Sequence, residues 1–266
     1  KRGIAMCFAV FLVYSHTLES DIMDPLHNHA QSGDYQYVYQ TITQNPKKLH
    51  SICSQGSGYY GFEFTLLHSA CSGSDNSLSV VQLLVNFGLS VNEVGREGRE
   101  SVTPILIAVR RGNVNIVRYL VSVGADYKGI SARDVISSKN IQLLDFFYSL
   151  NNQMFQITSF KVDCIKYSDD RVCEYLLSKD SKYFNNTECC FAAIETDNVK
   201  KFEYIASSGY LVNKETIIEK VIKDKKKNIF KYYAKRDIDF SKYIKDWESY
   251  EFLNDNAPEA FNNFKQ

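Results

Sequence analysis

A helix–turn–helix pattern recurs along this chain, and it is clearest between Thr103 and Asp126, in the sequence TPILIAVRRGNVNIVRYLVSVGAD. Thr103 and Pro104 are typical of a helix start, Gly112 breaks the pattern in the middle, and Gly124 is placed to end the second helix. The apolar residues between these signals are spaced for one buried face per helix: Leu106, Ala108, Val109, Val114, Ile116, Val117, Leu120 and Val121. One such pair is too small to fold alone, so the pattern predicts neighbouring pairs that stack and share a core.

Two earlier segments repeat the pattern. Residues 65–92 keep a Thr at the start, a Leu-Leu pair in the second helix and a Gly after it, with two extra residues in the turn. Residues 24–42 begin with DPLH and carry a Gly at the break. The three segments resemble the ankyrin repeat, whose series runs T-P-L-H-x-A-A, a central Gly, V-V-x-L-L and G-A-D-x-N. In the segment 103–126 the His of that series is replaced by Leu106.

Weaker copies follow and align with residues 103–126 without gaps. The aligned segments are residues 159–182, then 197–209 (DNVKKFEYIASSG) and 228–240 (NIFKYYAKRDIDF), while residues 131–150 supply one more helix pair with a shorter turn. The T-P-L-H series is absent from all of them. The resemblance therefore implies about seven units, degenerate after residue 130.

The fold expected from the resemblance is an all-α ankyrin-repeat solenoid of about seven stacked helix–turn–helix units with short finger loops. The repeat domain would span residues 23–240. Residues 241–266 would form a cap and a tail, because Tyr243, Trp247, Tyr250 and the Phe252-Leu253 pair lie near helical spacing. Ala70, Ala108 and Ala193 are expected where helices approach closely.

Residues 1–22 leave three interpretations open. Lys1 and Arg2 precede an apolar run, residues 4–14, that has the length of a signal-peptide core but is too short to cross a bilayer. The segment is a secretory signal, an extension outside the folded unit, or a helix packed on the first repeat. Seven Cys without metal-type or paired spacing indicate a reducing compartment, so we expect a cytoplasmic protein, or a secreted one if residues 1–22 are a signal.

No motif for catalysis, a cofactor or a metal is recognisable. All five His lie in the first quarter of the chain, so the later Cys have no nearby base, and no phosphate-binding or nucleophile motif occurs. His27 and His68 occupy the T-P-L-H position, where the resemblance implies that imidazoles tie neighbouring loops together. His27 and His29 lack a third metal ligand. With 31 basic and 31 acidic residues the chain is neutral, which gives no reason to expect nucleic-acid binding.

The resemblance implies that partners bind to the finger loops and to the ends of the first helices, which line a concave groove. The residues at such positions are Phe62, Phe64, Arg99, Glu100, Arg110, Arg111, Lys166 and Tyr167. Phe62 and Phe64, beside Tyr59 and Tyr60, are apolar where the family is usually polar. They serve as contact residues, or they pack onto the first repeat; the sequence leaves both open.

The finger VGREGRES, residues 94–101, concentrates arginine near Arg110 and Arg111. This concentration suggests a partner with acidic groups held by guanidinium. The competing interpretation is that Glu97 and Glu100 neutralise these arginines within the chain. We therefore expect a non-catalytic scaffold that binds a partner protein; the alternative is an enzyme or effector whose active segment lies in residues 131–266.

Overall fold

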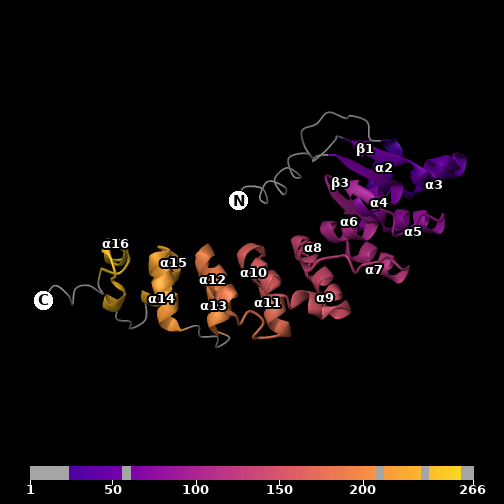
Figure 1. Ribbon diagram of the computed structural model, residues 1–266. Coiled ribbons are helices and arrows are strands. Elements are labelled where there is room, and N and C mark those ends of the chain that lie inside the picture. Colours follow the sequence, from indigo (N-terminus) through magenta and orange to yellow (C-terminus); the bar gives the residue numbers. More distant parts are fainter. Residues whose placement is uncertain (1–23, 56–60, 208–212, 235–239, 259–266) are drawn as a thin grey trace. The chain divides into compact units, whose positions relative to one another are not determined.

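The computed structural model of the protein describes residues 24–55, 61–207, 213–234 and 240–258 (Figure 1). The chain divides after Ile130 into two compact units. We call the part up to Ile130 unit 1 and the part from Ser131 unit 2. The segment 1–22, Tyr59 and Tyr60 lie outside the described residues, so the interpretations of these residues stay predictions.

The described part of unit 1 contains three helix pairs and two finger hairpins. The helices are α2 (Pro25–Ser32), α3 (Tyr35–Gln44), α4 (Leu66–Ser72), α5 (Leu78–Asn86), α6 (Pro104–Arg111) and α7 (Val114–Ser122). The first helices pack in series, α2 on α4 and α4 on α6. Ala70 and Ala108 are fully buried on α4 and α6, as expected for close helix contacts, while Leu106 and Val121 are only half-buried.

The helix ends in unit 1 follow from the residues that the sequence places there. Thr103 Oγ1 accepts a hydrogen bond from the Leu106 amide at 3.4 Å, and Pro104 opens α6, where its missing N–H costs nothing. Gly112 ends α6 at φ 76° and Gly33 ends α2 at φ 82°. A side chain at Gly33 would meet the Asn76 carbonyl at 2.7 Å, so close packing as well as the positive φ requires glycine there.

The two fingers of unit 1 join into one antiparallel sheet. Its strands are β1 (Ile52–Gln55), β2 (Phe62–Thr65), β3 (Gly95–Glu97) and β4 (Glu100–Val102), in that order. Each finger is a short hairpin, and β2 pairs with β3 through Phe62 with Glu97 and Glu63 with Arg96. The sequence predicted short finger loops and no sheet larger than one finger. The pairing of β2 with β3 differs from this expectation and holds the two fingers in one register.

The described residues of unit 2 form four more helix pairs and a final helix. These elements follow one another in sequence order (Figure 1). They are α8 (Ala132–Ser137), α9 (Ile141–Leu150), α10 (Thr158–Tyr167), α11 (Asp170–Lys179), α12 (Thr187–Thr196), α13 (Val199–Ser207), α14 (Lys214–Lys223), α15 (Lys227–Ala234) and α16 (Trp247–Asn256). Apolar residues that the gap-free alignment placed in the core are buried: Cys164, Val172, Cys173, Leu176, Ala193, Phe202 and Ile229. The prediction of an all-α stack of helix pairs is therefore confirmed.

The C-terminal cap differs in detail from the expectation. A single 3-10 turn covers Ser241–Tyr243, and α16 begins only at Trp247. Phe252 packs edge-on to Phe230 of α15, with ring centroids 5.2 Å apart, so the helix does cover the last pair. Trp247, expected on the apolar face, is 73% exposed because it lies in the first turn, on the side away from Phe252 and Leu253.

Candidate functional site

Two buried histidines hold the bases of the fingers in unit 1. His27 Nδ1 lies 2.7 Å from Ser69 Oγ of α4, and its Nε2 lies 3.0 Å from Ser51 Oγ, just before β1. Burial is the largest effect on the His27 pKa and lowers it. This confirms the loop-tying role that the ankyrin resemblance implied for His27.

His68 holds the base of the second finger on α4. Its Nε2–H donates to the Val102 carbonyl at 3.1 Å, while its Nδ1 accepts from Thr65 Oγ1 at 2.7 Å. Burial lowers the pKa of His68 to about 4, so the neutral ring is the form that fits this site. Both fingers are thus fixed to rigid helices by side chains that the sequence pattern identified.

The aromatic pair of the first finger lies on one face of the finger sheet. Phe62 and Phe64 alternate with Glu63 along β2, and both rings are half-buried. Their centroids lie 5.0 Å apart, and Phe64 stacks against the His68 ring at 5.7 Å. Phe64 therefore packs on the repeat, and both rings remain partly accessible. The role of the pair as contact residues stays a prediction.

Arg110, at the end of α6, bridges both carboxylates of the second finger. Its two terminal nitrogens lie 3.2 Å from Glu97 and 2.8 Å from Glu100. Glu100 is 64% exposed, so this cluster reaches the surface. Arg99 and Arg111 are exposed in the same region, and Arg96 contacts Glu63 at 3.8 Å. For Arg110, the structure thus shows the pairing with Glu97 and Glu100 that was the competing interpretation of the sequence.

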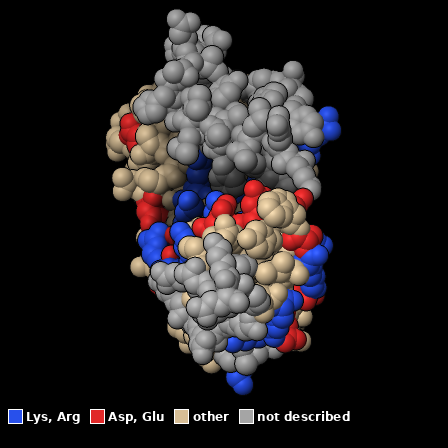
Figure 2. Space-filling model, turned by 90° about the vertical axis from the view of Figure 1, so that its left-hand side faces the viewer, with Lys and Arg blue, Asp and Glu red and all other residues tan. Residues whose placement is uncertain are grey.

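Lys166 and Tyr167 belong to unit 2, so the eight candidate residues do not fall in one compact unit. Lys166 Nζ lies 2.5 Å from a Glu195 oxygen, and this contact raises the Lys166 pKa. Tyr167 is 76% exposed. Arg133 pairs with Asp163 on the neighbouring helices α8 and α10. On the face drawn in Figure 2, basic and acidic residues lie side by side, in keeping with such pairs.

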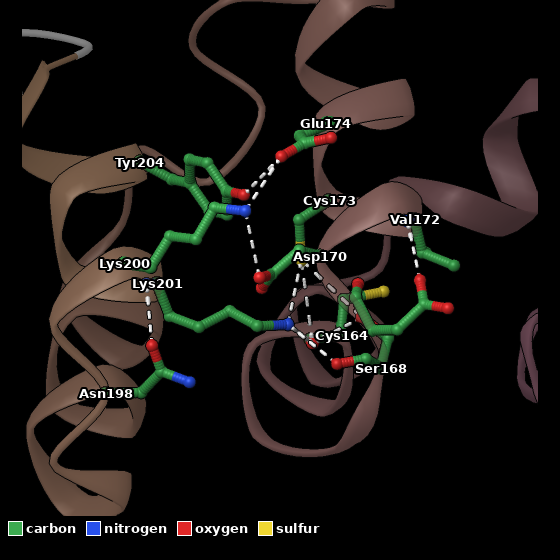
Figure 3. Close-up of polar contacts among 11 residues, drawn as sticks. Cys164, Ser168, Asp170, Val172, Cys173, Glu174, Asn198, Lys200, Lys201 and Tyr204 are labelled. Atoms are coloured by element: carbon green, nitrogen blue, oxygen red, sulfur yellow. Dashed lines mark hydrogen bonds and ion pairs between the residues drawn. The ribbon is translucent and has the colours of Figure 1, made fainter.

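A buried lysine in unit 2 escaped the sequence analysis. Lys201 of α13 is 3% exposed, and its ammonium donates to the Ser168 carbonyl at 2.8 Å, the Cys164 carbonyl at 3.2 Å and Cys173 Sγ at 3.2 Å (Figure 3). It therefore satisfies carbonyls at the end of α10. The gap-free alignment places Lys201 where unit 1 has Ile116, and that polar-for-apolar exchange was the signal that could have identified it.

Exposed polar contacts join the second helices of successive pairs in unit 2, which are α9, α11 and α13. Lys200 lies 2.9 Å from Asp170 and 3.1 Å from Glu174, and the Tyr204 hydroxyl donates to Glu174 at 2.9 Å (Figure 3). The Tyr175 hydroxyl makes an equivalent bond to Asp145 at 2.6 Å, one repeat earlier. These contacts replace the finger and histidine contacts of unit 1 as links between repeats.

The described cysteines are all buried thiols. Burial raises the pKa of Cys189 and of Cys190 to about 11, and raises that of Cys71 further. Such thiols are poor nucleophiles at neutral pH. Within the described ranges, no group of three or more His, Cys, Asp or Glu could hold a metal ion, and no helix is long and apolar enough to cross a bilayer.

Comparison with known proteins supports the repeat assignment. Residues 26–130 match a family model described as ankyrin repeats in three copies. The chain is also similar to a protein of Acanthamoeba polyphaga mimivirus named putative ankyrin repeat protein L271, with 27% identity over 164 residues. That match covers 58% of this chain and 21% of the relative, so the chain spans about a fifth of the relative's length. Ankyrin repeats suggest a protein–protein interaction domain and are generally non-catalytic. Residues 26–130 are thus similar to three ankyrin repeats, and helix pairs of the same architecture continue in the described residues after residue 130.

Proposed function

We propose that this protein binds a partner protein through the finger loops and adjoining concave groove of unit 1, without catalysing a reaction. The observation that carries the proposal is the partly open Phe62–Phe64 pair beside the Arg110 cluster, on fingers fixed by His27 and His68. A rigid surface loses little conformational entropy when a partner binds.

The proposed contact surface has an apolar centre and a charged rim. Phe62 and Phe64 would be the anchors, because half-buried aromatic side chains dominate binding energy at many interfaces. Arg99, Glu100 and Arg111 would form the rim with Arg110. The rim would contribute mainly to association rate and specificity, because exposed charge pairs add little affinity.

A partner with acidic groups fits this rim best. Glu100 is the more exposed of the two carboxylates on Arg110, so a partner carboxylate could take its place without disturbing the contact with Glu97. Guanidinium favours such exchange because it binds carboxylates in a planar, two-point geometry. Lys166 and Tyr167 would form a separate contact on unit 2.

Affinity capture with the full chain, followed by measured binding of the captured protein, tests the proposal. Phe62→Ala should weaken binding clearly. Charge reversal of Arg110 and Arg111 to Glu should weaken it more at low than at physiological ionic strength. Trp247→Ala is the control, because Trp247 is an exposed aromatic side chain on α16 outside the proposed surface. Equal effects of Phe62→Ala and Trp247→Ala would contradict the proposal.

A further inference from the structure

Strand β1 is an open edge of the finger sheet. In the described part of the chain it pairs only with β2, and nothing lies hydrogen-bonded on its other side. Its start is held in place, because Ser51 bonds to the buried ring of His27. The edge is therefore a fixed row of backbone groups.

The register shows which groups of β1 point outward. The Gly98 amide donates to the Gly61 carbonyl at 2.7 Å, and hydrogen-bonded pairs alternate along an antiparallel ladder. Glu63 therefore bonds toward β3, whereas Phe62 and Phe64 bond toward β1. The N–H and C=O groups of Ile52 and Ser54 consequently face away from the sheet.

The described residues of this edge lack two of the features by which proteins block unwanted strand pairing. Sheet edges are commonly protected by charged side chains or proline. Residues 52–55 contain neither, and the Ile52 side chain is 58% exposed. The opposite edge, β4, begins with Glu100 and follows Arg99, so it carries charge.

Basic residues precede the open edge. Lys47 and His50 lie in the 3-10 turn Pro46–His50 that leads directly into β1, and both are exposed. Among the described residues no carboxylate pairs with either, whereas Lys48 between them is bound to Asp24 at 2.8 Å. The end of the edge at Ile52 is thus apolar and follows the positive charge of Lys47.

We propose that β1 accepts an extended segment of the partner protein as an additional strand. This inference rests on the proposed function, and it specifies that the partner binds through an extended segment. The segment places an aliphatic side chain against Ile52 and acidic residues beyond that end, near Lys47 and His50. Main-chain hydrogen bonds to Ile52 and Ser54 provide affinity, and the flanking contacts provide specificity.

The test uses peptides selected against the full chain from a phage-displayed library of short random sequences. Ser54→Pro removes one outward N–H and leaves the β1–β2 ladder intact. Ser101→Pro is the matched control, because the pairing of Ser101 with Arg96 leaves its N–H pointing outward on the β4 edge. Ile52→Lys places a charge on the open edge, so it is a second variant that does not depend on proline.

The selected peptides should alternate apolar residues and carry an acidic end. Ser54→Pro and Ile52→Lys should each weaken their binding roughly tenfold or more, and Ser101→Pro should leave it within about twofold. Thermal unfolding of each variant identifies loss of folding. Peptides that depend on Phe62 but bind Ser54→Pro and Ile52→Lys normally would overturn this inference while the proposed function stands. Peptides that depend on neither Phe62 nor β1 would overturn both.

Discussion

Three positions of unit 2 place ordinary side chains in a left-handed turn. In unit 1 the break between paired helices is made by glycine, at Gly33 and Gly112. The equivalent residues of unit 2 are Lys139, Asp197 and Lys225, with φ of 55°, 53° and 52°. This conformation costs about 1–2 kcal/mol for most L-residues, and less for Asp. Replacing the side chain by glycine should therefore relieve strain, unless that side chain makes a compensating contact.

Asp197 makes such a contact and Lys225 does not. The Asp197 carboxylate accepts hydrogen bonds from the Ile229 amide at 3.0 Å and the Asn228 amide at 3.1 Å. Those amides lie in the first turn of α15, where no backbone partner exists, so Asp197 caps the helix of the next repeat. Among the described residues, Lys225 pairs with Glu248 in an exposed ion pair, and such a pair contributes little to stability.

The two glycine substitutions should therefore have opposite effects. Lys225→Gly relieves strain but adds about 0.5–1 kcal/mol of unfolded-state entropy, so the free energy of unfolding should rise by up to about 1 kcal/mol. Asp197→Gly loses a cap that typically contributes about 1 kcal/mol, and glycine again adds unfolded-state entropy. Because Asp has little strain to relieve, the free energy of unfolding should fall by about 1–2 kcal/mol.

Urea unfolding of the full chain, followed by circular dichroism, measures both changes. Hydrogen exchange of peptides from α14 and α15 should localise them to that pair, because repeat proteins open in local steps. If both variants shift stability in the same direction, Asp197 is not acting as a cap across the repeats.

Other predictions concern the core, pH and local stability. Ala108→Leu should lower the free energy of unfolding by about 1–3 kcal/mol, measured by urea unfolding, because the fully buried Ala108 has no space for a larger side chain. The pKa of His68 is about 4 in the folded chain and about 6.5 in the unfolded chain, so the unfolded chain binds the proton more readily. The free energy of unfolding should therefore fall by about 2 kcal/mol from pH 7 to pH 5. A His68→Gln variant with the same pH dependence would refute the role of His68 in this loss. Hydrogen exchange should be slower at buried residues of unit 1 than at buried residues of unit 2. The residues to compare are Leu83, Leu84, Val117 and Leu120 in unit 1, and Ile229 and Phe230 in unit 2.

The sequence was sufficient for the parts of the fold that depend on local spacing. The roles of His27 and His68 were implied by the resemblance to the ankyrin repeat. The helix pairs and the glycine breaks follow from residues close together in the chain. The buried alanines could be predicted for the same reason. These features need only the period of the repeat and the conformational preferences of Gly and Pro.

The features that the sequence did not predict depend on contacts between repeats. The pairing of β2 with β3 depends on how close the two fingers lie in the folded chain. Lys201 is buried because the end of α10 presents carbonyls to it. The sequence left open whether Glu97 and Glu100 pair with the arginines, and in the structure both pair with Arg110. A sequence identifies the residues that could form such contacts, but tertiary packing selects the pairs.

Hydrogen exchange of the full chain, with and without its captured partner, tests most directly whether the partner binds the fingers and groove of unit 1. Binding through the finger sheet predicts slower exchange in peptides that cover residues 62–65 and 95–102, with no change in α14 to α16. Protection confined to unit 2, or to the outer helices α3 and α5, would contradict the claim that the partner binds the fingers and groove of unit 1.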